Sequence, residues 1–242
     1  MLFKDLLKLT AWEILNPFLL KLKRNRIYGF KAGYTGINLG CGLDNPSNWI
    51  GIDGGVSVVV KNMPRPIIKL MYRFQNTSKN VDVNTFITKL KSTEIIHFDF
   101  KYGIPFANAT VPNIYSSHFF EHLSREHCNF ILKNCFRVMK NGGIIRICVP
   151  SLDEEVDKIR NALHCYDSGD ILPIEKYVTN SSSGYLSAYS NHRWMYNFDE
   201  MKKMLMAAGF TQIEERSFRE GRLPDVEILD TRGGLHVEGI KP

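Results

Sequence analysis

Five short hydrophobic runs, each closed by a turn or by polar residues, constrain the fold of this 242-residue chain more than any other feature. Their sequences are TGINLGCG (35–42), NWIGIDGG (48–55), TEIIHFDF (93–100), PNIYSSH (112–118) and GGIIRICVP (142–150). Runs of this length, bounded by turn residues, predict β-strands. Two alternating runs near the end of the chain, TQIEERSF (211–218) and LHVEGI (235–240), predict two more.

Helical periodicity fills two of the gaps between these runs. Apolar residues recur every three or four positions from Cys128 to Met139, after a predicted N-cap at Ser124. A second apolar stripe predicts a helix from about Asp199 to Ala208. The alternation of strands and helices predicts an α/β fold: a Rossmann-like, doubly wound sheet, mostly parallel, with an antiparallel C-terminal edge strand.

The chain divides into a basic helical extension over 1–31 and one domain over 32–242, with insertions at about 55–92 and 154–196. The extension holds seven Lys or Arg and two Asp or Glu, which accounts for five of the six net positive charges. A nucleic-acid-binding face across the domain is therefore not expected. The extension is either a solvated cap helix or an arm that contacts anionic lipid at a membrane surface.

Hydropathy and cysteine usage indicate a reducing, cytoplasmic location. No run approaches the roughly 18–20 apolar residues of a membrane span, and the N-terminus lacks the pattern of a signal peptide. The five cysteines form no C-x-x-C pair, which argues against a disulfide framework and against a thiolate zinc site. If the extension binds lipid, the protein lies peripherally at the inner face of the membrane.

The predicted strands end in residues suited to a nucleoside-bearing cofactor. The ends are, in chain order, Gly40-Cys41-Gly42, Asp53, Asp99 and Ser116-Ser117-His118. The carboxyl ends of parallel strands meet at one edge of a sheet, where ligands bind. Glycines let the backbone approach a ligand, and carboxylates accept hydrogen bonds from ribose hydroxyls or an exocyclic amine. Each feature alone is also explained by a tight turn or a helix cap.

The glycine turn favours S-adenosylmethionine over NAD. A dinucleotide site needs the third glycine of G-x-G-x-x-G, but Asn45 stands there, and the charge of Asp44 would repel a pyrophosphate. S-adenosylmethionine has no phosphate, and its sulfonium and ammonium groups suit acidic neighbours. Asp53 follows Gly42 by eleven residues, where about twenty are usual. The first crossover helix is therefore expected to be reduced to a turn.

These motifs, with GIPFANATVPNIYSSHFFEHL and RVMKNGGIIRICVP, resemble those of class I S-adenosylmethionine-dependent methyltransferases, in particular the methyltransferase type 11-like group. The resemblance covers roughly residues 35–153, and the segment HRWMYNFDEMKKMLMAAGF (192–210) is similar to the same group. It implies that Gly40, Cys41 and Gly42 contact the methionine portion of the cofactor and that Asp53 binds the ribose. It also implies that Asp99 and Phe100 bind the adenine, and that Ser117 and His118 line the floor near the methyl group.

The stretch SSHFFEHL (116–123) also carries the order H-x-x-E-H of one class of zinc peptidase. That chemistry needs His118 and His122 on one face of a helix, with Glu121 beside them. The preceding residues are strand-like, so His118 is expected at a strand–loop junction, and no third ligand stands at a convincing spacing. No metal is therefore expected, and Glu121 and His122 are interpreted as opening the next helix.

Methyl transfer to a hydroxyl needs a base, and His118 and then His192 are the candidates. Acceptor-binding candidates are Arg193, Trp194 and Tyr196, since aromatic and planar polar groups suit a sugar ring, although Trp194 and Tyr196 could equally cover the core. The resemblance extends to predicted methyltransferases of bacterial surface-glycan clusters. It implies O-methylation of a small polar acceptor such as a sugar or glycan precursor. Methylation of a lipid or quinone at the membrane surface, NAD(P)-linked redox chemistry and a non-catalytic nucleotide-binding module remain alternatives.

Overall fold

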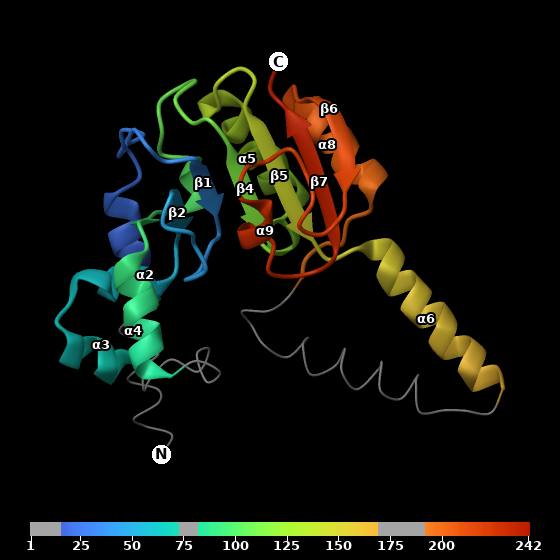
Figure 1. Ribbon diagram of the computed structural model, residues 1–242, viewed down its shortest axis with the longest axis horizontal. Coiled ribbons are helices and arrows are strands. Elements are labelled where there is room, and N and C mark those ends of the chain that lie inside the picture. Colours follow the sequence, from blue (N-terminus) through green and yellow to red (C-terminus); the bar gives the residue numbers. More distant parts are fainter. Residues whose placement is uncertain (1–15, 73–81, 169–191) are drawn as a thin grey trace. The chain divides into compact units, whose positions relative to one another are not determined.

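The computed structural model describes residues 16–72, 82–168 and 192–242, whose strands form one seven-stranded sheet (Figure 1). The strands are β1 (Gly36–Leu39), β2 (Trp49–Asp53), β3 (Ile95–His97), β4 (Ile114–Ser117), β5 (Ile144–Val149), β6 (Thr211–Arg216) and β7 (Leu235–Ile240). Their order is β3-β2-β1-β4-β5-β7-β6. β1 pairs in parallel with β2, and β2 with β3, whereas β7 is antiparallel to both β5 and β6. The predicted Rossmann-like fold is confirmed, with β6 outermost and the antiparallel β7 beside it.

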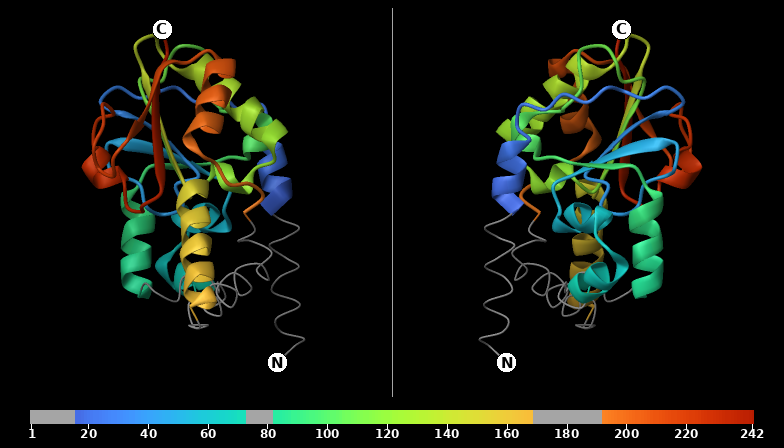
Figure 2. Two further views of the ribbon diagram at one scale, coloured as in Figure 1. Left: turned by 90° about the vertical axis from the view of Figure 1, so that its right-hand side faces the viewer. Right: turned by 90° about the vertical axis from the view of Figure 1, so that its left-hand side faces the viewer.

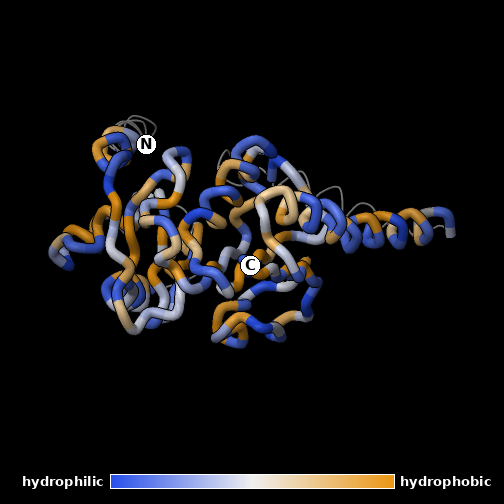
Figure 3. Tube along the Cα trace, turned by 90° about the horizontal axis from the view of Figure 1, so that it is seen from above, coloured by the Kyte–Doolittle hydropathy of each residue, from blue (hydrophilic) through white to orange (hydrophobic). Residues whose placement is uncertain are grey.

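Contacts along the chain define two compact units, and each is described by itself. Unit 1 comprises Met1–Tyr115 and Asn134–Gly143, and unit 2 comprises Ser116–Lys133 and Ile144–Pro242. Unit 1 holds β1 to β3, and unit 2 holds β5 to β7. Most strand residues are hydrophobic and lie buried in the core. Figure 3 shows the hydropathy of each residue along the trace.

The connection from β1 to β2 has no helix in residues 40–48, as the spacing predicts. Parallel strands are usually joined by a dozen or more residues. Two amides hold this shorter turn: Asn45 Nδ2 donates to the carbonyl of Trp49 at 2.6 Å, and Asn38 Nδ2 donates to that of Asp44 at 3.2 Å. Gly51 on β2 is needed beside it, because a Cβ there would stand 2.5 Å from Cys41 Sγ.

The described part of the predicted 55–92 insertion is a small helical layer of unit 1. It comprises α2 (Val56–Val59), the 3-10 helix η1 (Val60–Asn62), α3 (Arg65–Tyr72) and α4 (Val83–Ser92). Its apolar core consists of Val60, Ile68, Phe86, Ile87 and Leu90. Asp82 caps α4 by accepting a hydrogen bond from the amide of Asn84 at 2.8 Å.

The described residues of the N-terminal extension pack against the rest of unit 1. A helix covers 16–22, and its Leu20 is buried. Beyond it, the amide of Tyr28 donates to the carbonyl of Pro105 at 2.8 Å, and Phe30 meets Phe106 edge to face with ring centroids 6.1 Å apart. Residues 16–31 are therefore held on the domain, whereas residues 1–15 lie outside the described part of the chain.

Unit 2 carries a second set of helices around its strands (Figure 2). They are η4 (Phe120–His122), α6 (Leu152–Asp167), α8 (Phe198–Ala208), α9 (Val226–Leu229) and the first part of α5 (Arg125–Val138), which ends in unit 1. Both helices predicted from periodicity are present. Ser124 Oγ accepts from the amide of His127 at 3.3 Å, as expected for the cap of α5. Along α6, hydrophobic and hydrophilic residues alternate with the turns of the helix (Figure 3).

A buried arginine joins β5 to the C-terminal part of unit 2. Arg146 is fully buried, and its guanidinium pairs with the carboxylates of Asp230 and Glu238, which are also fully buried. A buried charge is tolerated only when it is paired in this way. The hydropathy of the sequence gives no sign of this pairing. Among the described residues, no helix combines the length and the hydropathy that crossing a bilayer requires.

Candidate active site

The glycine turn Gly40-Cys41-Gly42 ends β1 and leaves open space on one side. Gly40 and Gly42 have φ of 65° and 55°, in the left-handed region that glycine adopts without penalty. The amide of Gly40 donates to the carbonyl of Ile52 at 2.9 Å, which fixes the turn against β2. A Cβ built on Gly42 would meet no atom within 4 Å, so the space beside this residue is free for a ligand.

Asp53, at the end of β2, is hydrogen-bonded to the glycine turn. Its Oδ2 accepts from the amide of Gly42 at 2.9 Å, and its Oδ1 accepts from the amide of Gly55 at 2.6 Å. A carboxylate has about four lone-pair positions, so both oxygens retain capacity for the hydroxyls of a ribose. Asp53 therefore orders the glycine turn and also offers hydrogen-bond acceptors to a ligand beside that turn.

Cys41 lies between the two glycines of the turn, but its thiol faces Gly51 on β2. Its Sγ lies over Gly51, and burial raises the pKa of the thiol well above its ordinary value, with the charge of Asp53 adding to the effect. The thiol is thus held protonated and unreactive. Only the backbone of Cys41 remains suited to the predicted contact with the cofactor.

Asp99 and Phe100 lie just beyond β3, which ends at His97. Asp99 caps the 3-10 helix η3 (Phe100–Tyr102): its Oδ1 accepts from the amide of Lys101 at 3.0 Å, and its Oδ2 pairs with Lys101 Nζ at 2.9 Å. The ring of Phe100 is buried in unit 1. Both residues follow the strand end as predicted, and their contact with an adenine stays a prediction.

The N-terminal extension reaches the ends of β2 and β3 through two side chains, Asn16 and Lys23, that sequence reasoning missed. Asn16 Nδ2 donates to the carbonyl of Gly54 at 3.0 Å, and its Oδ1 lies 2.9 Å from Nε2 of the buried His97. Lys23 Nζ lies 3.1 Å from His97 Nδ1. Burial and then the charge of Lys23 lower the pKa of His97 to about 4. His97 is therefore neutral, accepting at Nδ1 from the ammonium and donating from Nε2 to Asn16.

His118 follows β4 in unit 2 with an unusual backbone conformation. Its φ is 51°, in the left-handed region, while its amide still donates to the carbonyl of Cys148 at 2.9 Å. A residue other than glycine in this region costs on the order of 1 kcal/mol or more, and such strained residues cluster at functional sites. His118 is at the predicted strand–loop junction, and Ser117, half-buried, is the last residue of the strand.

Glu121 orients His118 and does not cap the next helix, so that interpretation was wrong. Glu121 is fully buried on η4, and its Oε1 lies 3.1 Å from His118 Nδ1. Helix α5 begins only at Arg125, so the carboxylate faces the histidine and not free helix amides. An ionised carboxylate only accepts, so Nδ1 carries the hydrogen and Nε2 keeps its lone pair. His118 Nε2 is buried and has no hydrogen-bond partner among the described residues.

The segment that begins at His192 is bound to η4 through its backbone. The amides of Arg193 and Trp194 donate to the carbonyl of Glu121 at 2.7 and 3.2 Å. The ring of His192 then meets that of His122, with centroids 5.2 Å apart. Burial lowers the pKa of His192, an effect that the nearby Glu121 opposes. The two base candidates predicted from the sequence thus belong to one cluster in unit 2.

The residues predicted to bind the methyl acceptor differ in burial: some lie on the surface and one lies in the core. Trp194 is 39% exposed, stacks with the guanidinium of Arg125 at 3.9 Å, and donates from Nε1 to Glu200 at 3.3 Å. Tyr196 is fully buried, and its hydroxyl lies 3.0 Å from Cys128 Sγ. The prediction that Tyr196 binds an acceptor was therefore wrong, because its ring and its hydroxyl are both used within the core. For Trp194 and the exposed Arg193 the role stays a prediction.

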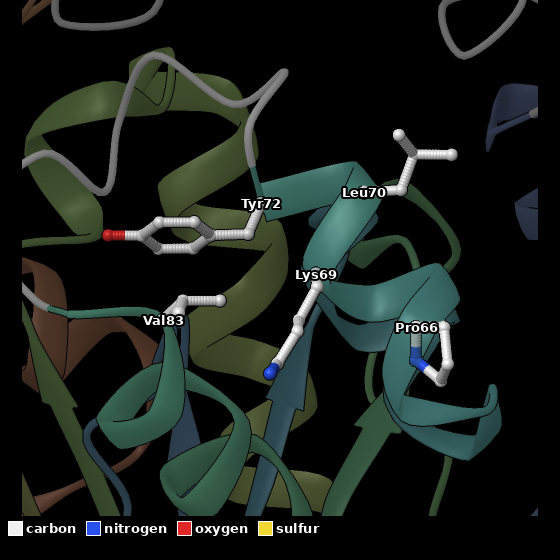
Figure 4. Close-up of a pocket in the computed structure, with 5 residues that line it drawn as sticks. All are labelled: Pro66, Lys69, Leu70, Tyr72 and Val83. Carbon is white, nitrogen blue, oxygen red and sulfur yellow. The ribbon is translucent and has the colours of Figure 1, made fainter.

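A pocket of about 510 Å³ lies elsewhere in unit 1, between α3 and α4 (Figure 4). Its described lining consists of Pro66, Lys69, Leu70, Tyr72 and Val83. The Lys69 side chain extends from α3 on the same side as Val83, whereas the Leu70 side chain points away from Val83 (Figure 4). None of these lining residues is among those predicted from the strand ends, so the pocket gives no support to the candidate site.

Comparison with known proteins gives two family matches. A family model described as a methyltransferase domain matches residues 37–147, and that of the ubiE/COQ5 methyltransferase family matches residues 124–224. No match was found among curated proteins. Together the two models cover residues 37–224, which include the carboxyl ends of β1 to β6 but not β7.

Similar solved structures include a SAM-dependent methyltransferase from Archaeoglobus fulgidus. The identity is 16%, with 95% of this chain and 94% of that chain covered and a TM-score of 0.46. A second is phosphoethanolamine N-methyltransferase 2 from Haemonchus contortus, in complex with phosphomonomethylethanolamine and S-adenosylhomocysteine. Here the identity is 13%, with 94% of this chain and 52% of that chain covered and a TM-score of 0.43.

Proposed function

The chain belongs to the class I S-adenosylmethionine-dependent methyltransferases, and we propose that it methylates an oxygen atom of a small polar acceptor such as a sugar or a surface-glycan precursor. The family fixes the cofactor as S-adenosylmethionine and the reaction as methyl transfer. The chemical class of the acceptor is our proposal, and it depends on the cluster that surrounds His118.

The observation that carries the proposal is the pair formed by His118 and Glu121. The carboxylate holds the hydrogen of the imidazole at Nδ1, 3.1 Å away, so that Nε2 presents a lone pair. A hydroxyl acceptor must lose a proton when its oxygen is methylated, whereas an acceptor that is already anionic or unprotonated needs no base. A buried carboxylate that fixes the tautomer of a histidine is an arrangement suited to a general base.

The residues of unit 1 suit S-adenosylmethionine. The open space beside Gly42 admits a close approach, and the oxygens of Asp53 retain lone pairs for hydroxyl donors. When bound, the cofactor would supply a methyl group on its sulfonium, and S-adenosylhomocysteine would leave as the acceptor oxygen bonds to the methyl carbon. His118 Nε2 then takes the hydroxyl proton, and Glu121 stabilises the resulting imidazolium through Nδ1.

The test is turnover of the His118→Ala variant with a panel of deoxysugar nucleotides and glycan fragments. The rate should fall by about 10²- to 10⁴-fold, the usual contribution of a general base. Affinity for S-adenosylhomocysteine should stay unchanged. The matched control is His127→Ala, an exposed histidine on α5. A His118→Ala variant with wild-type turnover would show that the imidazole is not the base.

A cheaper preliminary experiment separates the enzyme from its alternatives. Calorimetric titration with S-adenosylhomocysteine and with NADH, side by side, should give binding of the first and none of the second. Binding without turnover on any acceptor would favour the non-catalytic nucleotide-binding module.

A second candidate function is methylation of a lipid or quinone at the inner membrane surface, and one observation favours it. Phe18 and Leu22, one helical turn apart on the helix over 16–22, are 58% and 66% exposed, and Ile27 is 65% exposed. The basic residues Lys21, Arg24 and Arg26 alternate with them along the chain. Exposed apolar side chains among basic ones are typical of segments that lie in the lipid interface.

A further inference from the structure

The structure brings together a cluster of possible metal ligands that the sequence does not show. One ligand atom each from Glu121, His122 and His192 lies within 4.8 Å of the others. The first two residues are on η4, and the third is seventy residues further along the chain. The absence of a third ligand is the reason for expecting no metal from the sequence, and His192 removes that reason.

Glu121 provides an independent indication that this cluster takes a ligand. Its side chain has no exposed surface, and its Oε2 has no hydrogen-bond partner among the described residues. An unpaired carboxylate oxygen in the interior loses its hydration without compensation, which is unfavourable unless a cation or a donor is supplied. Its other oxygen, Oε1, accepts from His118 Nδ1 at 3.1 Å and lies 4.0 Å from His122 Nε2, so the carboxylate as a whole borders the cluster.

The backbone fixes the positions of the three groups before any ligand arrives. Glu121 accepts at its own carbonyl from the amides of Arg193 and Trp194, at 2.7 and 3.2 Å. These bonds hold the residue next to them, His192, against His122. Ligand atoms around Zn²⁺ lie roughly 3.3 Å apart, so closure around an ion needs side-chain shifts on the order of 1 Å.

The charges also suit a divalent cation. Two neutral imidazoles and one carboxylate give a net charge of −1, and no arginine or lysine is paired with Glu121 among the described ion pairs. A second cluster in unit 2, Cys148, Asp230 and His236, has similar spacing. There the guanidinium of Arg146 already neutralises Asp230, so a cation would be repelled.

We propose that Glu121, His122 and His192 bind a divalent transition-metal ion, with Zn²⁺ as the reference ion, and leave one coordination position open to an oxygen ligand. Two histidines and a glutamate form a three-ligand set that is typical of sites with an open position. His118 then acts from outside the coordination sphere, because its Nδ1–H bond orients the carboxylate that binds the metal. The open position would accept water or an oxygen atom of the acceptor.

The experiment is calorimetric titration of the chelator-treated, full-length protein with ZnCl₂, with neither S-adenosylmethionine nor acceptor present. We expect about one Zn²⁺ per chain. His122→Ala and His192→Ala should each weaken the affinity at least tenfold, since even loss of an outer-shell partner typically costs 10- to 100-fold. His127→Ala should bind as the wild type does. Co²⁺ in place of Zn²⁺ should give visible absorption bands that both ligand variants lose.

The two ligand variants are chosen because His122 and His192 are at least partly exposed, so that folding, checked by circular dichroism, is expected to persist. Wild-type protein that binds no Zn²⁺, or binds it equally well in His122→Ala and His192→Ala, would overturn the proposal. Because metal binding is measured without cofactor or acceptor, its outcome is independent of the test of the proposed function.

Discussion

Replacing Asp53 by alanine should separate two contributions that one carboxylate makes. In the structure Asp53 accepts from the amides of Gly42 and Gly55 at 2.9 and 2.6 Å, and when cofactor is bound it is expected to accept from the ribose as well. Hydrogen bonds to a charged group contribute about 1.5–3 kcal/mol each. Loss of the ribose contact alone therefore predicts an affinity for S-adenosylhomocysteine about 10- to 150-fold lower.

The glycine turn adds a second term to this loss. Without Asp53, the amide of Gly42 loses its acceptor, and the turn must be ordered again by the ligand at an entropic cost of about 1–2 kcal/mol per residue fixed. Asp53→Asn keeps one carbonyl oxygen and loses the charge, so its affinity should lie between those of the wild type and Asp53→Ala. Thermal unfolding should change little, because Asp53 is at a strand end and its two hydrogen bonds are exposed, so that water can replace the lost acceptor.

The assay is calorimetric titration with S-adenosylhomocysteine, and Asp44→Ala is its control. Asp44 is in the same turn and carries the same charge, but it pairs with Lys89 at 2.8 Å in an exposed ion pair. Such pairs contribute about 0–1 kcal/mol, so Asp44→Ala should bind almost normally. Equal losses in Asp44→Ala and Asp53→Ala would show that only general negative charge matters. A folded Asp53→Ala variant with wild-type affinity would remove Asp53 from the site.

Two further predictions concern the N-terminal extension. The pKa of His97 is lowered to about 4 in the folded protein. Between about pH 4 and 6.5 the unfolded state therefore binds more protons than the folded state. The free energy of unfolding should consequently rise with pH by on the order of 3 kcal/mol across that window. Urea unfolding at several pH values should show this rise flattened in His97→Gln, and an unchanged slope would contradict it. If the extension binds lipid, Phe18→Asp/Leu22→Asp should abolish co-sedimentation with anionic vesicles, whereas Phe130→Asp, on α5, should not; vesicles that fail to bind the wild type would exclude the membrane candidate.

Local sequence determined the strands, the helices α5 and α8, and the cofactor, whereas α6 (Leu152–Asp167) lies almost wholly in the stretch predicted as an insertion. Every strand except β6, in which only Ile213 is buried, is a short run of mostly buried residues that leaves a strong hydropathic signal. The spacing between Gly42 and Asp53 correctly predicted a crossover without a helix in residues 40–48, because nine residues are too few to form one and return. The position of His118 at a strand end followed from the same pattern.

Contacts between distant segments could be decided only by the tertiary structure. Nothing near Arg146 in the sequence indicates that Asp230 and Glu238 neutralise it, and nothing near His97 indicates Asn16 and Lys23 as its partners. A buried polar group leaves no periodic signal, since its partner is set by how the chain folds back and not by spacing. For the same reason Tyr196 could not be distinguished from a surface aromatic until its hydroxyl was placed beside Cys128.

The segment SSHFFEHL (116–123) shows which features the sequence determines and which only the tertiary structure decides. The sequence alone determined that His118, Glu121 and His122 stand together at the end of a strand, because neighbours in the chain remain neighbours in space. Only the fold decided that the carboxylate turns toward His118, that its second oxygen is left without a partner in the described structure, and that His192 closes the cluster. The bonds that bring His192 there run from backbone amides to the carbonyl of Glu121, outside any helix or strand, so they leave no periodic pattern in the sequence.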